Sequence, residues 1–197
     1  MKKVTISLLS AMALFAASCD KGDDPITPQP TSTKTAYITT KVAPVPGQKV
    51  GFNFATDTEV KTIDSTLKNW DFSIAFTTMR INSNASGVGN AGVQILDIPF
   101  STITSAPETG YAYDTTATKL AVKGSSWYIY NATTHSFAPI AGKTFVFKTA
   151  EGNYAKMEIL EALPVNDSGA VVTPPTMPTQ IKYKFNYNYQ PNGSRNF

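Results

Sequence analysis

The sequence predicts an all-β fold: a single antiparallel β-sandwich or barrel-like domain with long loops. The run near the C-terminus alternates aromatic and polar side chains, which is typical of a strand with one packed face and one solvated face. Two β-prone runs flank the turn Glu151-Gly152-Asn153, a hairpin pattern. Outside the first residues no window repeats with the helical period. Many short strands with Gly/Pro turns favour a sandwich or barrel.

The predicted strands follow one another along the chain, separated by turn residues such as Pro46-Gly47. Each contains β-branched or aromatic residues that fit a pleated, half-buried surface. In order they are Tyr37–Val42, Val50–Phe54, Val60–Ile63, Phe72–Phe76, Met79–Ile81, Gln94–Leu96, Trp127–Tyr130, Thr144–Thr149, Tyr154–Leu160 and Ile181–Tyr189.

The N-terminus has the pattern of a lipoprotein signal peptide. Lys2 and Lys3 precede an apolar run from Val4 to Ala17, which is too short to span a bilayer as a helix. Small residues then lead to Cys19, the only cysteine of the chain. This arrangement predicts cleavage before Cys19 and acylation of that residue, palmitate included, by several chains that together anchor a protein stably. An ordinary cleaved signal with an incidental cysteine is the alternative.

Three regions follow from this pattern: a signal peptide over 1–18, a lipidated Pro/Thr-rich tether over 19–35, and the all-β domain over 36–197. Acidic residues just after Cys19 resemble a surface-export signal of Bacteroidetes lipoproteins. With one cysteine, the domain has no internal disulfide and no thiolate metal cluster. Of 17 Lys and Arg residues two lie in the signal, and 14 Asp and Glu residues nearly balance the rest, so no nucleic-acid partner is expected.

Four blocks of the sequence closely resemble the HmuY family, the haem-binding surface lipoproteins of Bacteroidetes. The first joins the strand Trp70-Asp71-Phe72-Ser73-Ile74-Ala75 through Arg80-Ile81-Asn82 to a Gly-rich loop, with Pro107-Glu108-Thr109-Gly110-Tyr111 further on. The others are the Trp-led strand Trp127–Tyr130, the hairpin Val146–Met157 and the closing aromatic strand Lys182–Tyr187. These blocks are scaffold. We expect Trp70 and Trp127 in the core, Asp71 and Arg80 paired across the sheet or partly solvated, and Lys156 pointing outward.

The resemblance implies haem held between loops, with two axial ligands of the His/His or Met/Met kind. The matching loop, 112–126, contains neither His nor Met, and the second matching position falls on Asn131 and Ala132. The ligand candidates are therefore His135, the only histidine, and Met177 in a Pro-rich loop. An exposed turn histidine without a role is the alternative for His135. Candidate pocket walls are Tyr111, Tyr113, Tyr128, Tyr130 and Phe137, with Lys119 or Lys123 as propionate partners.

The leading interpretation is a lipid-anchored, hemophore-like outer-membrane protein at the cell surface that binds haem or a related porphyrin for iron acquisition. A TonB-dependent outer-membrane transporter is the candidate protein partner. The alternative keeps the HmuY-like fold without haem ligation and recognises a protein, peptide or glycan. Apart from haem iron no metal is expected, and no enzyme is expected, because no catalytic carboxylate pair, phosphate loop or nucleophile–base pair stands out.

Overall fold

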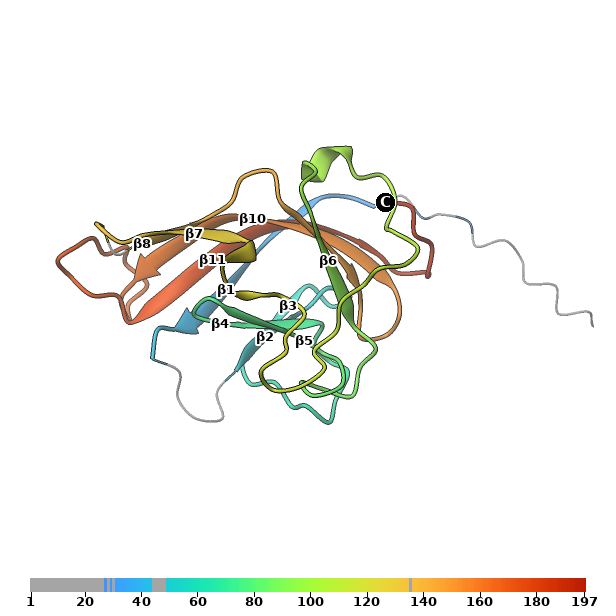
Figure 1. The fold of residues 1–197 in the computed structure, drawn as a ribbon, viewed down its shortest axis with the longest axis horizontal. Coiled ribbons are helices and arrows are strands. Elements are labelled where there is room, and N and C mark those ends of the chain that lie inside the picture. The colour runs from blue at the N-terminus through green and yellow to red at the C-terminus, as the bar shows by residue number, and fades with distance from the viewer. Residues whose placement is uncertain (1–26, 28, 30, 44–48, 135) are drawn as a thin grey trace, which may run out of the picture.

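The computed structural model describes residues 27, 29, 31–43, 49–134 and 136–197, and in this part the fold is all-β (Figure 1). The larger antiparallel sheet has the order β1(Lys34–Lys41), β11(Gln180–Gln190), β10(Tyr154–Val165), β9(Thr144–Lys148) and β6(Gly92–Leu96). The smaller has the order β3(Thr58–Val60), β2(Val50–Asn53), β4(Phe72–Ala75) and β5(Thr78–Ile81). A separate hairpin pairs β7(Tyr128–Asn131) with β8(Ser136–Pro139), and two 3₁₀ turns occupy Phe100–Thr102 (η1) and Gly124–Ser126 (η2).

The sheets pack as a sandwich around an aromatic core. Phe52 from the smaller sheet meets Phe185 of β11 edge to face with 5.0 Å between ring centroids, and Phe54 meets Phe147 of β9 at 5.1 Å. Such offset and edge-to-face pairs add to the area that the rings bury. The predicted core anchors are confirmed, because Trp70 and Trp127 are fully buried. The predicted sandwich is therefore confirmed, and the two sheets stay separate rather than forming a barrel.

Most predicted strands are present, with three differences. The strand predicted over Val60–Ile63 was wrong in position and lies at Thr58–Val60. Strand β10 continues to Val165, past a register shift between Ile159 and Glu161. Strand β8 was not predicted, because Ser136–Pro139 contains a proline and small residues that do not favour strands. Among the described residues, no helix is long and apolar enough to cross a membrane.

The predicted signal peptide over 1–18 and Cys19 lie outside the described residues, so the structure does not bear on them.

Asp71 joins the two sheets. Its carboxylate accepts backbone N–H bonds at 2.8 Å from Phe54, just after β2, and from Ala150, just after β9. The expectation that Asp71 pairs with Arg80 or stays solvated was wrong: the side chain is 3% exposed, and its partners are backbone amides. Burial raises the pKa of Asp71 to about 6, against the lowering effect of the two amide donors.

The Gly-rich loop after β5 closes around Asn82. The side-chain amide donates to Leu67 O and Trp70 O at 3.0 and 2.8 Å, and its oxygen accepts from the backbone N–H of Gly89 at 2.9 Å. A methyl group on Gly87 would overlap Asn82 Oδ1 and lie 2.9 Å from Trp70 Cζ2. One on Gly89 would lie 2.6 Å from Asn82 O and 2.8 Å from Ala150 Cβ. The glycines are needed here because of this close approach.

Lys156 is a buried cation. It points away from the sandwich core, as expected, but it does not meet water. It lies on the outer face of β10 but is 6% exposed, because the η1 segment covers it. Its ammonium donates to Phe100 O at 3.0 Å and Ile103 O at 2.6 Å, and it lies 4.5 Å from the Phe100 ring centroid. These carbonyls and the ring replace water around the charge, while burial lowers the pKa of Lys156.

Replacing either loop glycine by alanine is expected to destabilise the fold. Gly87→Ala and Gly89→Ala should each lower the free energy of unfolding by about 1–3 kcal/mol, because the rigid surroundings must move to admit a methyl group. Urea denaturation measures the change. Val88→Ala, an exposed substitution in the same loop, is the control and should stay within about 0.5 kcal/mol of the wild type. Equal stability of the glycine variants and the control would contradict this packing.

Asp71 makes stability depend on pH. Its folded pKa of about 6 lies above the ordinary value of 3.8, so the folded state binds the proton more tightly than the unfolded state. The free energy of unfolding should therefore fall as pH rises from about 4 to about 6, by on the order of 3 kcal/mol, and flatten above that. Urea titrations across this range should show this slope in the wild type. Asp71→Asn should remove it, whereas the exposed Asp97→Asn should retain it. A wild type without the slope would contradict the shift.

Candidate functional site

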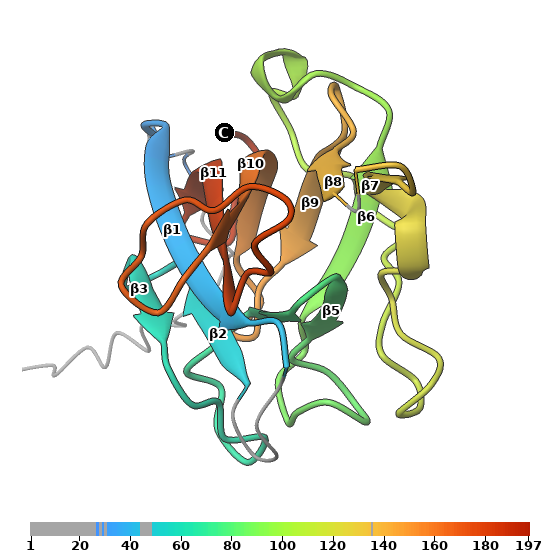
Figure 2. The ribbon, with the colours of Figure 1, turned by 90° about the vertical axis from the view of Figure 1, so that its left-hand side faces the viewer.

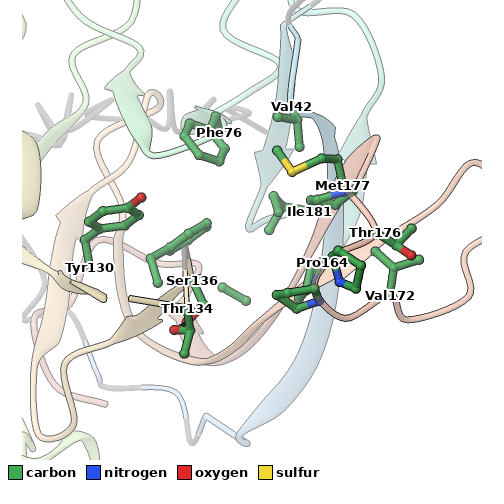
Figure 3. A pocket seen from close by; sticks show the side chains of 15 residues that line it. Val42, Phe76, Tyr130, Thr134, Ser136, Pro164, Val172, Thr176, Met177 and Ile181 are labelled. Atoms are coloured by element: carbon green, nitrogen blue, oxygen red, sulfur yellow. Dashed lines mark hydrogen bonds between the residues drawn. The ribbon is translucent and has the colours of Figure 1, made fainter. Parts of the chain in front are cut away.

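One apolar pocket of about 450 Å³ lies at the end of the sandwich where β11 begins (Figure 3). Residues at or near the ends of β1, β10 and β11 line it, together with residues of the β7–β8 hairpin, the β4–β5 turn and the loop between β10 and β11. Figure 2 views the molecule from the side on which Figure 1 shows this hairpin and this loop. None of its described lining residues carries a charged side chain. The lining residues are Val42, Phe76, Tyr130, Thr134, Ser136, Phe137, Ala162, Pro164, Val172, Pro174, Pro175, Thr176, Met177, Pro178 and Ile181.

The pocket exists because β9 is short. Strand β9 pairs with β10 only over Tyr154–Met157, so the second half of β10 has no β9 neighbour. The β7–β8 hairpin contacts β10 instead and is not hydrogen-bonded into the larger sheet. The proline-rich loop between β10 and β11 forms the pocket wall opposite the hairpin. Proline has no backbone N–H, so this wall carries fewer polar groups that burial would leave unsatisfied.

Phe76 forms the wall nearest the smaller sheet. It has a left-handed backbone with φ of 52°, an unfavourable angle for a bulky residue. Two contacts hold this turn: the Tyr183 hydroxyl donates to Phe76 O, and the Phe76 ring meets Phe137 edge to face at 5.4 Å. Burial raises the pKa of Tyr183, so its hydroxyl stays protonated and remains a donor. The fold thus fixes an aromatic ring at the pocket mouth.

Met177 lies at the rim of the pocket opposite Tyr130 (Figure 3). Its side chain is 77% exposed, although thioethers usually lie in cores. It carries the only sulfur among the described lining residues. A thioether in this position can reach a ligand in the pocket or coordinate a soft metal centre.

The structure brings three predicted site residues together and separates others. Met177, Tyr130 and Phe137 line the pocket. Tyr128 does not; it packs behind Phe137 and against Trp127, with centroid distances of 5.6 and 5.0 Å. His135 lies outside the described residues, although Thr134 and Ser136 line the pocket.

Tyr111 and Tyr113 do not belong to this pocket, contrary to their expected role as walls. The Tyr111 hydroxyl donates to Pro107 O at 3.0 Å, and its ring lies 6.4 Å from that of Tyr154. Tyr113 lies against Gly92 of β6, where a methyl group would approach its ring to 2.9 Å. Both tyrosines therefore pack against the other end of the larger sheet.

The loop expected to carry the first family ligand has a structural anchor instead. Asp114 is fully buried, and its carboxylate accepts bonds from Ile81 N, Ser86 Oγ and Ala121 N at 3.0, 2.6 and 2.7 Å. A hollow of about 300 Å³ beside this loop includes Lys123, while Lys119 lies in an exposed turn, so neither lysine lines the apolar pocket. In the described part of the chain, no three His, Cys, Asp or Glu side chains gather as a metal site.

Sequence reasoning missed Phe76 and the proline wall as site residues. Phe76 reads as the last core residue of a strand, and only its positive φ turns it toward the pocket. The run Thr173-Pro174-Pro175-Thr176-Met177-Pro178 was a usable signal, because clustered prolines mark a loop and leave its backbone with few N–H groups. In the structure this run makes a turn, in which Thr176 N donates to Thr173 O at 3.0 Å.

Comparison of the fold with solved structures gives two informative neighbours. Apo PinO from Porphyromonas gingivitis aligns with a TM-score of 0.54 at 12% identity, covering 83% of this chain and all of that one. The apo HmuY analog of Tannerella forsythia aligns with a TM-score of 0.50 at 18% identity, covering 85% of this chain and all of that one. This chain has an HmuY-like fold. No protein-family model and no curated protein sequence matches it.

The HmuY-like fold confirms the resemblance found in the sequence at the level of architecture. At 12–18% identity the likeness concerns the scaffold and does not transfer a ligand or its binding residues. The function must be argued from the pocket of this chain.

The hydrogen bond that holds the Phe76 turn can be tested by Tyr183→Phe. Loss of the hydroxyl leaves Phe76 O without its donor and should lower the free energy of unfolding by about 1 kcal/mol, measured by urea denaturation. Tyr37→Phe, at an exposed tyrosine, is the control and should change stability by less than about 0.5 kcal/mol. If the two variants are equally stable, the hydroxyl does not hold the turn.

Proposed function

We propose that this chain is a lipid-anchored surface protein that binds haem or a related porphyrin. The observation that carries the proposal is the apolar pocket, whose described lining residues are uncharged and which has a methionine thioether at its rim. Its volume of about 450 Å³ falls within the range of roughly 300–1,000 Å³ typical of small-molecule and cofactor sites. An apolar, flat ligand suits these walls, because they offer few polar groups that such a ligand would leave unpaired.

The residues present fit a porphyrin in two respects. Phe76, Phe137 and Tyr130 supply aromatic surface for the faces of a macrocycle, and Met177 supplies a soft donor. Haem, when bound, supplies an iron centre whose axial positions take imidazole or thioether ligands. Met177 would hold such an iron from the proline wall, and His135 remains the second candidate ligand. This set differs from the paired ligands that the family resemblance implies.

Anchoring and delivery complete the proposal. The signal peptide over 1–18 and Cys19 support a lipid anchor in the outer membrane with the domain at the cell surface. A protein that holds haem there would pass it to an import system, for which a TonB-dependent transporter is the proposed partner. The HmuY-like fold is consistent with this role.

A haemin titration of the full processed chain, in oxidised and reduced form, tests the function. We expect a saturable red shift of the Soret band with sharp low-spin bands. Met177→Leu keeps the apolar volume and should lose the low-spin bands while retaining binding. Met177→Ala should weaken binding by about tenfold, which is roughly 1.4 kcal/mol. His135→Ala assigns the second ligand by the same spectral changes.

Val171→Ala is the matched control, because Val171 is exposed on the same loop but does not line the pocket. It should titrate like the wild type. A broad, unsaturable absorbance change in the wild type would remove the haem proposal. The alternative of a surface protein that recognises a protein, peptide or glycan would then take its place.

A further inference from the structure

A row of side-chain amides on β11 holds the start of the described chain. Asn186, Asn188 and Gln190 alternate along the strand with the core residues Phe185, Tyr187 and Tyr189, so they share its outer face. The sequence predicts that this face meets water. Instead, Asn188 is 7% exposed and Gln190 is fully buried, so other segments of the same chain must cover them.

The described residues before β1 contribute to this cover, together with Asn196 near the C-terminus, whose backbone oxygen accepts from Gln190 Nε2 at 2.6 Å. Asn188 accepts from Thr33 Oγ1 at 2.9 Å and donates to Thr31 Oγ1 at 3.0 Å. Gln190 Nε2 donates to Gln29 O at 2.8 Å, and Asn192 Nδ2 donates to Thr27 O at 2.6 Å. Thr35 Oγ1 continues the row to Asn186 Oδ1 at 2.8 Å.

We propose that the described residues from Thr27 to Thr35 form a docked strap rather than a free tether, and that the strap points the pocket away from the membrane. The strap leaves the domain at the Asn192 end of β11, whereas the pocket lies at the Ile181 end. Figure 1 shows the first described residues and the C-terminus together at one end of the molecule and the β7–β8 hairpin at the other.

Chain geometry sets the distances. Ten residue steps along β11, from Gln180 to Gln190, separate the two ends by about 33 Å. The eight steps from Cys19 to Thr27 reach at most about 28 Å, against about 55 Å for the sixteen steps from Cys19 to an undocked Thr35. Docking of the strap thus halves the maximum distance that the chain can span between Cys19 and the domain. It also gives the domain a preferred orientation. This second half of the proposal rests on the proposed lipid anchor at Cys19.

Spin labels test the docking on the full chain carrying Cys19→Ser, without lipid. Labels at Ser32→Cys and at the exposed Ala170→Cys should give one narrow distance distribution. Adding Thr31→Val, Thr33→Val and Asn192→Asp should broaden it. Asp at 192 keeps the oxygen that accepts from Ser194 N but removes the donor to Thr27 O. The control combines Thr62→Val, Thr173→Val and Asn69→Asp, at exposed positions away from the strap, and should stay narrow. A broad distribution without the strap substitutions overturns the strap.

Energy transfer tests the orientation on the lipidated chain in phosphatidylcholine vesicles that carry a headgroup-labelled acceptor lipid. A donor at Glu151→Cys, in the β9–β10 turn at the strap end, should transfer several-fold more efficiently than a donor at Ala170→Cys. With the strap substitutions, the donors at the two positions should transfer energy with nearly equal efficiency. Equal efficiencies with the strap intact, or mass spectra without an acyl group on Cys19, overturn the orientation. Neither arm involves haem, so failure of haem binding and failure of the strap are separate results.

Discussion

The buried carboxylate of Asp71 is the interaction on which the arrangement of the two sheets depends. It lies just before β4 and accepts backbone hydrogen bonds from Phe54 and from Ala150, so one side chain joins the segments that follow β2 and β9. The hydrophobic effect that drives the two sheets together is non-directional. The two hydrogen bonds fix which part of one sheet faces which part of the other.

Two further polar side chains near Asp71 add hydrogen bonds that hold the surrounding loops. Asn82 bonds to Leu67, Trp70 and Gly89, and Asp114 bonds to Ile81, Ser86 and Ala121, so each polar side chain ties several segments of backbone. Buried polar groups that are fully hydrogen-bonded restrict a core to one arrangement. Asp71, Asn82 and Asp114 gather around the start of β4 and the end of β5, whereas the turn between these strands lies at the pocket.

The pocket follows from an imbalance in strand length. Strands β10 and β11 have 12 and 11 residues, whereas β9 has 5, so the long pair extends beyond its neighbour. The hairpin, the Phe76 turn and the proline-rich loop cover this extension without filling it. The strap binds the opposite end of β11. One long strand thus carries the proposed binding site at its start and the attachment of the N-terminal segment at its end.

The sequence by itself determined the fold class, most strand positions and the core aromatic residues, because strand alternation and turn residues are local properties of the chain. It also selected Met177, Tyr130 and Phe137, but from a family resemblance and loop composition rather than from any contact. Only the tertiary structure decided that Asp71 and Lys156 are buried, since their partners are backbone groups from distant segments. It also decided that Tyr111 and Tyr113 lie away from the pocket. The direction of Phe76 and the covering of Gln190 likewise depend on chain more than 100 residues away, which no local pattern can encode.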